Sequence, residues 1–484
     1  MWSPFGPRPP HLTLGRQGAG PFSRPYKLPL SETASHVHVQ GLSGVGKSRF
    51  LAGFFLELLK SGLPATVVDP HGDLYRLLLA SLVDSGLLDD PKVRERILFL
   101  DLPAADKIGW YLPFNVLAAP NDPHTISRQV VEAMRRVWPS LEGGVAPTFE
   151  NLMVASSFVL ASHRLDLTLI HDLLTDKEWR DRLLTEVGDE TVRRFFAERH
   201  DRWRREQALM IESTLRRVFL LAFSPVLRYS LAQPDNLFDF GRIMAEGRSL
   251  VVNLALDDGD ARRLLGSLLA VGAEQAALAR ASLPPEERGP AYHLILDEFF
   301  EFSAQSGETL ARILSLTRKY GLSLVMAHQT YSQLGTRVQG ALQNAGLEVI
   351  FRLGRADAEA STGILGHADP LAVKHEVADS AASERTHPLY YGLAEQREEW
   401  TRRVAALPAR EAFVRRPTGK VARIRTLAVP DVAVDPDKLA WVEADYLRRY
   451  FRPKEEIEAE MESRRRATSP TVSRTVERKH DERR

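Results

Sequence analysis

The stretch GLSGVGKS, Gly41–Ser48, decides how the rest of this 484-residue chain is interpreted. It follows an alternating apolar run, SHVHVQG, and precedes a run with helical period, KSRFLAGFFLELLK. The spacing matches G-x-x-x-x-G-K-[ST], and its place between a strand and a helix separates a phosphate-binding loop from a chance match. A glycine-rich turn without a ligand is the alternative, which this context disfavours. The sequence therefore predicts a nucleoside triphosphate site.

The residue types in this loop suit phosphate chemistry. Its glycines allow a tight turn whose N–H groups converge on phosphate oxygens, and the following helix points its positive end at the same oxygens. Lys47 is expected to bridge the β- and γ-phosphates, and Ser48 to offer its hydroxyl to Mg²⁺. The other residues of the expected binding segment are Gly41, Ser43, Gly44, Val45, Gly46 and Arg49.

Strand-like and helical segments alternate along much of the chain, which predicts βαβ units and a mostly parallel sheet. Between about Pro123 and Gln233 the segments are all helical, so we expect a helical insertion in an α/β domain. We expect an N-terminal arm of extended chain or short strands, and a charged C-terminal tail that is disordered or partly helical from about Arg452. The expected boundaries are 1–34 for the arm, 35–122 and 237–430 for the α/β core, 123–236 for the insertion and 431–484 for the tail.

The apolar run AYHLILDEF ends in two adjacent carboxylates, Asp297 and Glu298. In open α/β sheets ligands bind outside the carboxyl ends of the strands, which is where these residues would lie. Asp297 is expected to hold Mg²⁺, and Glu298 to orient or deprotonate the attacking water. The alternative is an acidic strand-to-loop junction without a catalytic role. Together with the phosphate loop, the pair favours hydrolysis over transfer to a small acceptor.

The stretch SLTRKYGLSLVMAHQTY combines the end of an expected helix, GETLARILSLTRKY, with the next strand, LSLVMAHQ. Gln329 would end a strand beside that of Asp297, where its amide could hydrogen-bond a phosphate oxygen or the water; a strand-end cap is the alternative. Arg318 would lie far from its own loop, so its expected target is the nucleotide of an adjacent subunit. An arginine supplied in trans is worth about 10³–10⁵ in rate. The alternative for Arg318 is a solvated helix residue or a partner of the helix dipole.

Composition limits the remaining function classes. The formal net charge is +1, so a nucleic-acid surface must be a local patch or a channel lining. The chain contains no cysteine, which excludes disulfides and thiolate chemistry and fits a reducing cytoplasm. No long apolar run free of charge suggests a transmembrane segment, and the N-terminus does not have the pattern of a secretory signal.

Five motifs in order make a family resemblance specific. They are GLSGVGKS, VVDPHGDL, LILDEF, RKYGLSLVMAHQ and NAGLEVIFRLGRADAE. Over roughly residues 35–430 this set resembles the HerA/FtsK superfamily of RecA-like motor ATPases, most closely HerA and the TraG/TraD-type conjugative coupling proteins. The resemblance implies a RecA-like P-loop core with a mostly parallel sheet and an all-α inserted domain, ATP and Mg²⁺ as cofactors, and a homo-hexamer with DNA bound sequence-independently in a central pore.

The resemblance also maps roles onto residues. Lys47 and Ser48 match the Walker A positions, Asp297 and Glu298 the Walker B pair. Arg318 matches the trans arginine and Gln329 the sensor glutamine. The stretch VVDPHGDL matches the family's strand-two motif, in which the resemblance assigns no firm role to Asp69, His71 and Asp73. The alternative for these three residues is a tight turn near the nucleotide.

The leading hypothesis is a cytoplasmic ATP-driven DNA translocase of a mobile element or conjugation-like system. Membrane-anchored coupling proteins carry an N-terminal transmembrane region, which this sequence does not show. HerA carries an N-terminal β-barrel, and the arm of about 34 residues is too short to form one. Recruitment to the inner membrane or pairing with a nuclease would therefore need partner proteins. The alternatives are a motor for protein export or assembly and a regulatory nucleotide switch. The segment VRRFFAERHDRWRREQ, within Val192–Gln207, is a candidate DNA surface because it mixes arginine with Phe195, Phe196 and Trp203. The alternative for it is a solvated amphipathic helix with core aromatics.

Overall fold

The computed structural model describes thirteen stretches of the chain, separated by short gaps. They are residues 10–18, 20–119, 121–137, 146–201, 205–303, 314, 317–331, 334, 336–342, 344–365, 369, 371–378 and 386–468. The chain divides into two compact units. The first comprises Met1–Ala105, Glu132–Glu142 and Phe238–Tyr450, and the second comprises Asp106–Val131, Gly143–Leu237 and Phe451–Arg484.

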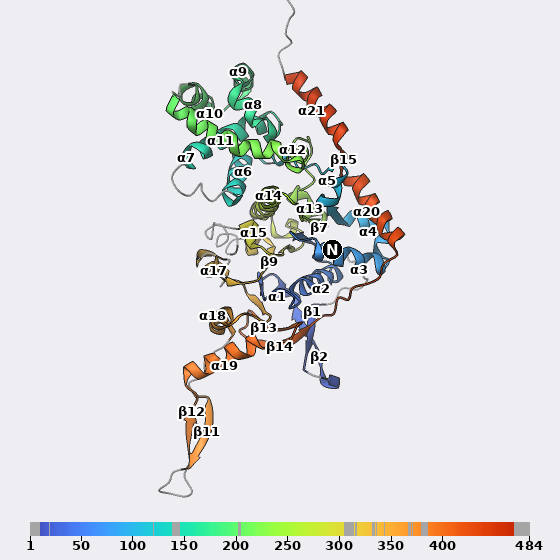
Figure 1. The fold of residues 1–484 in the computed structure, drawn as a ribbon, viewed down its shortest axis with the longest axis vertical. Helices are drawn as coiled ribbons and strands as arrows, with labels where there is room; N and C mark the ends of the chain where they lie inside the picture. Colours follow the sequence, from blue (N-terminus) through green and yellow to red (C-terminus); the bar gives the residue numbers. More distant parts are fainter. Residues whose placement is uncertain are drawn as a thin grey trace, which may run out of the picture. The chain divides into compact units, whose positions relative to one another are not determined.

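An eleven-stranded mixed sheet forms the centre of the first unit (Figure 1). Seven consecutive strands of it are parallel, in the order β10-β3-β9-β8-β4-β7-β5, and four antiparallel strands extend it beyond β10 in the order β13-β14-β1-β2. The strands are β1 (His11–Gln17), β2 (Arg24–Pro29), β3 (Val37–Gln40), β4 (Ala65–Asp69), β5 (Ile97–Asp101), β7 (Ser249–Asn253), β8 (Tyr292–Leu296), β9 (Leu322–His328), β10 (Leu347–Ile350), β13 (Glu411–Arg415) and β14 (Val421–Thr426).

The parallel strands form because each is a short apolar run that can be covered on both faces, which parallel sheets require. In β3, β4, β7, β8, β9 and β10 every residue is buried. Alternate residues such as Val67, Val251 and Ile295 join one core with the apolar faces of α2 (Lys47–Lys60), α3 (Asp73–Asp84) and α20 (Pro436–Tyr450). Figure 1 shows α13 (Phe240–Glu246) and α14 (Gly259–Ala279) on the other side of the strands.

The expected strands of the α/β core are all present, and the segments EAFVRR and KVARIRTL form two further strands, β13 and β14. The N-terminal arm contributes β1 and β2 to the sheet, so its two short runs of alternating burial are part of the core. The remaining elements of the first unit include α1 (Leu30–Thr33), α4 (Pro91–Arg96), α15 (Phe300–Ser303), α17 (Thr336–Leu342), α18 (Arg355–Leu365), the hairpin β11 (Val373–Ala378) and β12 (Thr386–Tyr390), and α19 (Leu393–Ala405).

The second unit is mainly helical and no strand occurs in its described residues between 123 and 237. Its helices are α7 (Ala146–Ser162), α8 (Ile170–Thr175), α9 (Lys177–Glu186), α10 (Glu190–Arg194), α11 (Arg205–Phe223), α12 (Pro225–Leu231) and α21 (Lys454–Thr468), with α5 (Leu102–Lys107) and α6 (Pro123–Val137) crossing between the two units in sequence. The fold class predicted from the sequence is therefore confirmed: an α/β core with a mostly parallel sheet and additional helical segments.

The C-terminal segment is more ordered than a charged tail. The short strand β15 (Arg452–Pro453) pairs with β6 (Trp110–Tyr111), and α21 packs against α12. Ile457 of α21 is fully buried, and Tyr229 donates a hydrogen bond to Glu458 over 2.6 Å. A helix with few apolar residues is held here because one buried side chain and several ion pairs anchor it, which charge composition alone does not reveal.

In the candidate DNA segment, one of the two described aromatic side chains is buried and the other, Phe195, is half-buried against it. Phe196 is fully buried within a π-helical turn, Phe195–His200, and Arg194 pairs with Glu198 on the exposed side. Trp203 lies outside the described residues. The interpretation as an amphipathic helix with core aromatics accounts for Phe196.

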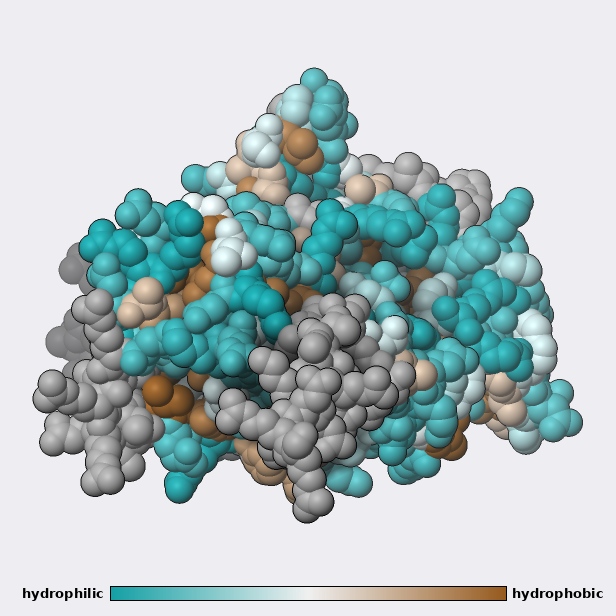
Figure 2. All heavy atoms as spheres, turned by 90° about the horizontal axis from the view of Figure 1, so that it is seen from above, coloured by the Kyte–Doolittle hydropathy of each residue, from teal (hydrophilic) through white to brown (hydrophobic). Residues whose placement is uncertain are grey.

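Figure 2 shows a mainly hydrophilic face with small apolar patches between polar side chains. None of the helices in the described part of the chain combines the length and the apolar character needed to cross a membrane.

Candidate functional site

The phosphate loop joins β3 to α2 at the carboxyl edge of the parallel strands. Gly44 and Gly46 have φ of 74° and 106°, a left-handed backbone that L-residues adopt only at a cost. Gly41 is required for a different reason: a Cβ there would lie 2.6 Å from Cβ of Phe351. Val45 is buried in the core, and its carbonyl accepts a hydrogen bond from the backbone N–H of Arg410 over 2.8 Å. The loop is thus fixed by packing beneath it.

Lys47 is the first residue of α2 and is 6% exposed. Its Nζ donates to the carbonyl oxygens of Gly41 (2.7 Å) and Leu42 (3.1 Å), which holds the ammonium over the loop. Burial lowers the pKa of Lys47, and the carboxylates of Glu298 and Asp297 oppose that shift. The ammonium and the two carboxylates therefore act on one another across the same site.

Ser48 and Asp297 meet at the end of β8, although 249 positions separate them in the chain. Ser48 Oγ donates to Asp297 Oδ2 over 3.2 Å. Burial, followed by the nearby carboxylates of Asp69 and Glu298, raises the pKa of Asp297 to about 6. A hydroxyl beside a carboxylate gives the hard oxygen donors that Mg²⁺ prefers.

Glu298 follows directly and has a left-handed backbone with φ of 42°, which is uncommon for a residue with a side chain. Its Oε1 accepts a hydrogen bond from Gln329 Nε2 over 2.8 Å, and its Oε2 has no hydrogen-bond partner among the described residues. Glu298 is 5% exposed. A carboxylate oxygen so placed is costly to leave unpartnered, so it is available for a ligand.

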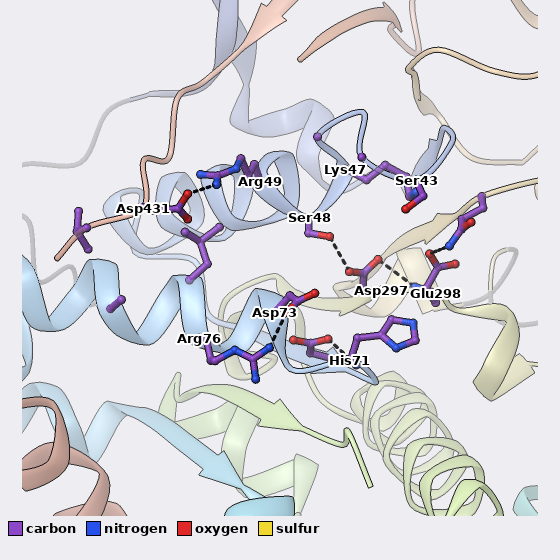
Figure 3. A pocket seen from close by; sticks show the side chains of 17 residues that line it. Ser43, Lys47, Ser48, Arg49, His71, Asp73, Arg76, Asp297, Glu298 and Asp431 are labelled. Carbon is purple, nitrogen blue, oxygen red and sulfur yellow. Dashed lines mark hydrogen bonds and ion pairs between the residues drawn. The ribbon is translucent and has the colours of Figure 1, made fainter. Parts of the chain in front are cut away.

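These side chains line one cavity of about 610 Å³. Figure 3 shows Lys47 and Ser43 on the loop, with Ser48 directed at Asp297 and Glu298 below it. The lining residues of the first unit are Ser43, Gly44, Gly46, Lys47, Ser48, Arg49, Asp69, His71, Asp73, Arg76, Leu77, Ala80, Asp297, Glu298, Gln329, Asp431 and Val432. The cavity is polar at the loop and includes the apolar side chains of Leu77, Ala80 and Val432.

The strand-two motif builds a turn at the wall of this cavity. Asp69 is 1% exposed and accepts hydrogen bonds from the backbone N–H groups of His71 (2.9 Å) and Tyr75 (2.8 Å). Gly72 within this turn has φ of 81°, and Asp73 pairs with Arg76 on the exposed side. Asp69 therefore shapes the turn, while its charge also acts on Asp297.

Sequence reasoning missed the contribution of a distant segment. Arg49 bonds to the carboxylate of Asp431 and to the carbonyl of Val429, which brings residues 429–432 to the cavity (Figure 3). Nothing in the sequence marks Asp431, because 382 positions separate it from Arg49. By contrast, Arg76, Leu77 and Ala80 could have been found as the residues of the helix that follows the strand-two motif.

Arg318 is the expected site residue that the structure does not place with the others. Its backbone belongs to a turn, Thr317–Tyr320, that leads into β9. Its side chain, like most of the expected helix at 307–320, lies outside the described residues. The prediction of a trans arginine therefore remains a prediction.

The residues present fit a nucleoside triphosphate with Mg²⁺. The left-handed glycines and the helix start form a cradle for phosphates, Lys47 supplies a buried cation, and Ser48 with Asp297 supplies oxygen donors. The unpartnered oxygen of Glu298 lies in the same cavity.

A comparison with family profiles gives a match over residues 26–426, to a family described as the type IV secretion-system coupling protein DNA-binding domain. The chain belongs to this family. The predicted resemblance to HerA/FtsK-type ATPases and to TraG/TraD-type coupling proteins is confirmed, and the match covers the seven parallel strands, the phosphate loop and the acid pair. Curated proteins give no significant match.

Solved structures of a coupling protein and of VirB4 share the fold of this family member. The plasmid coupling protein TrwB in complex with ADP and Mg²⁺ is 19% identical and has a TM-score of 0.54, with 90% of this chain and 98% of that chain covered. The bacterial conjugative coupling protein TrwBdeltaN70 is 20% identical, with a TM-score of 0.53 and coverage of 89% and 91%. VirB4 of Thermoanaerobacter pseudethanolicus is 13% identical, with a TM-score of 0.52 and coverage of 88% and 97%.

Proposed function

We propose that this coupling-protein family member hydrolyses ATP and uses the energy to move DNA, bound without regard to sequence, through the central pore of a homo-hexamer. The observation that carries the proposal is the joint cavity of the phosphate loop and the acid pair, with Ser48 bonded to Asp297 and Gln329 bonded to Glu298. The family match, whose description names a DNA-binding domain, supports DNA as the substrate.

The residues have distinct roles in this proposal. The N–H groups of the loop and Lys47 bind the phosphates, and Ser48 with Asp297 would hold Mg²⁺, which supplies charge neutralisation for the phosphates when bound. Glu298 accepts a proton from, or orients, the attacking water. Gln329 holds the Glu298 carboxylate in place and contacts the terminal phosphate or the water. TrwB, which shares the fold, has been solved with ADP and Mg²⁺ and with a non-hydrolysable ATP analogue, in line with these cofactors.

A ring makes the proposal complete, because Arg318 would act on the nucleotide of the next subunit. The backbone turn at Thr317–Tyr320 immediately precedes β9, and Gln329 follows the end of that strand. Within one subunit, β9 would therefore connect Arg318, which acts on the neighbour's nucleotide, to Gln329, which acts on the subunit's own nucleotide. Nucleotide state and subunit contact would then be coupled through β9. The biological setting that we propose is DNA transfer or processing by a mobile element or conjugation-like system, with the chain acting in the cytoplasm or recruited to a membrane by partner proteins.

The particle mass tests the assembly directly. The mass is measured with a non-hydrolysable ATP analogue and with single- or double-stranded DNA present. We expect a hexamer, and a particle that stays monomeric under all of these conditions would contradict the ring. Binding of an exported protein substrate without DNA binding would instead favour a protein-export motor.

A further inference from the structure

A cluster of buried titratable side chains lies beneath the nucleotide site and has no role in the function proposed above. His38 lies on β3, His328 on β9 and Glu348 on β10, three neighbouring parallel strands of the sheet. The two histidines are 0% exposed and the glutamate is 2% exposed. Burying three such groups in an apolar sheet is costly unless each of them is paired, so their arrangement calls for a physical reason.

The three side chains form one continuous chain of hydrogen bonds. Nδ1 of His38 lies 2.6 Å from Oε2 of Glu348, and Nε2 of His38 lies 2.6 Å from Nε2 of His328. Nδ1 of His328 lies 3.2 Å from the carbonyl oxygen of Thr330. The ring of Tyr331 packs edge-on against both imidazoles.

Hydrogen-bond chemistry fixes the number of protons in this chain. The Thr330 carbonyl can only accept, so Nδ1 of His328 carries a hydrogen. The bond between the two Nε2 atoms needs one hydrogen and one lone pair, and the bond between His38 and Glu348 needs one more hydrogen. The cluster therefore holds one proton more than an ionised glutamate and two neutral histidines, and its net charge is zero.

Burial decides which way the bond between the two histidines runs. Burial, followed by the nearby His38, lowers the pKa of His328 to about 2, so Nε2 of His328 is the acceptor of that bond. Three other titratable groups act on the cluster: Tyr331, Asp357 of α18 and Lys47 of α2. The carboxylate of Asp357 accepts a hydrogen bond from the backbone N–H of Tyr331 over 3.3 Å. Burial raises the pKa of Tyr331, so it stays neutral.

The cluster is connected to the nucleotide site at two points. His328 directly precedes Gln329, and its bond to Thr330 spans that glutamine. The carbonyl oxygen of His328 also accepts a hydrogen bond from the N–H of Gly41, the first glycine of the phosphate loop, over 3.3 Å. The strand that carries the glutamine and the strand that carries the loop are thus joined by backbone and by side chain.

We propose that His328 is a positioning residue for Gln329, held by a one-proton bond to His38 that Glu348 neutralises. The bond fixes the turn at residues 328–330 against β3, so the Gln329 amide is already placed on Glu298 beside the loop. This inference rests on the proposed function in one respect only, namely that Gln329 acts during ATP hydrolysis.

The variant His38→Leu/Glu348→Gln tests the positioning role without leaving a buried charge behind. Leucine at position 38 cannot donate to Nε2 of His328, so the bond between β3 and β9 is lost. We expect kcat for ATP to fall about tenfold, as small misplacements of catalytic groups do, with the Kd of a non-hydrolysable analogue changed by less than about twofold. The matched control is Glu57→Gln, a buried carboxylate on α2 that bonds Lys60 and the Thr13 N–H and should leave kcat unchanged.

The double variant His38→Gln/Glu348→Gln provides a rescue. The amide that this variant carries at position 38 can donate to His328 and accept from the amide at position 348, which restores every bond without an additional proton. We expect its kcat to return to within about threefold of the wild-type value. An unchanged kcat in His38→Leu/Glu348→Gln, or a His38→Gln/Glu348→Gln variant that is as slow in a folded protein, would overturn the positioning role.

The dependence of stability on pH tests the proton independently of activity. Above about pH 6.5 the unfolded chain has two largely neutral histidines and an ionised glutamate, whereas the folded wild type holds one proton more, so raising the pH from 7 to 9 should destabilise the folded state. Relative to the double variant His38→Gln/Glu348→Gln, the wild-type folding equilibrium should weaken by up to about tenfold per pH unit. If the free energies of unfolding in urea of the wild type and of the double variant change with pH in the same way, the one-proton bond is overturned. If the wild type hydrolyses no ATP, the proposed function fails. The pH dependence of the free energy of unfolding still shows whether the one-proton bond between His38 and His328 exists.

Discussion

Gln329 donates a hydrogen bond from Nε2 to Oε1 of Glu298 over 2.8 Å, across the ends of the neighbouring strands β9 and β8. The bond leaves Oε2 of Glu298 without a partner among the described residues and directs the carboxylate into the cavity of the phosphate loop. An amide that holds a carboxylate in this way places the acceptor for a water proton while adding no charge of its own. The pair is the structural core of the proposed hydrolysis.

Glu298→Gln should separate nucleotide binding from hydrolysis. The variant keeps the size of the side chain but loses the proton acceptor, so we expect kcat to fall by about 10²–10⁴, the range of general base catalysis. The Kd of a non-hydrolysable ATP analogue should stay within about threefold, because Lys47 and the loop are unchanged. The measurement is steady-state phosphate release together with analogue titration; retention of wild-type turnover would exclude Glu298 as the base.

Lys47→Ala should abolish nucleotide binding. The ammonium is buried at the loop, and loss of two charge-assisted hydrogen bonds to phosphates corresponds to about 100-fold or more in Kd. Lys60→Ala, at the far end of the same helix α2, is the control and should bind the analogue as the wild type does. The measurement is calorimetric titration, and similar affinities of the two variants would place the phosphates elsewhere.

Arg318→Ala should assemble but fail to hydrolyse ATP, with a loss of about 10³-fold or more if the arginine acts in trans. Lys319→Ala is the control, since Lys319 is an exposed neighbour in the same turn. Mixing Arg318→Ala with Lys47→Ala subunits should restore part of the activity, because some interfaces then combine an intact loop with an intact arginine. A mixture as inactive as its components would place the arginine in its own subunit's site.

His293 should make the folded state sensitive to acid. Its Nε2 donates to the Thr33 carbonyl over 3.2 Å, its Nδ1 has no partner among the described residues, and burial lowers its pKa to about 4. Between pH 6.5 and 4 the unfolded chain takes up a proton that the folded chain excludes, so stability falls as pH falls, by up to about 3 kcal/mol. Urea unfolding against pH should show a smaller acid loss for His293→Phe, whereas His171→Phe, at an exposed position, should match the wild type. Equal acid sensitivity of all three would contradict the role of His293.

The parallel half of the sheet could be predicted from the sequence because its strands are short, fully buried apolar runs between helices, and the phosphate loop marked the first of them. The acid pair and Gln329 could be placed at the same edge because the ends of parallel strands meet there. The strands β1 and β2 were harder to predict, since Pro25, Pro29 and Gly15 interrupt them and only their antiparallel neighbours make them strands.

Contacts between distant segments could not be predicted. His38, His328 and Glu348 are isolated polar residues in apolar strands, and the sequence does not show that β10, β3 and β9 are neighbours. The same holds for Asp431, which reaches the cavity through Arg49, and for α21, whose anchoring depends on one buried isoleucine in a charged helix. A polar residue inside an otherwise apolar strand is the signal that could have drawn attention to the histidine cluster.

The rate of ATP hydrolysis with and without DNA tests the central claim most directly. Phosphate release is measured at low salt for the wild type and for Glu298→Gln, with no DNA, with single-stranded DNA and with double-stranded DNA of several sequences. The account predicts that DNA raises the wild-type rate several-fold regardless of sequence, that added salt removes the effect because the contacts are to phosphates, and that the variant stays at background. A wild-type rate that is the same with either form of DNA and without it would contradict the account.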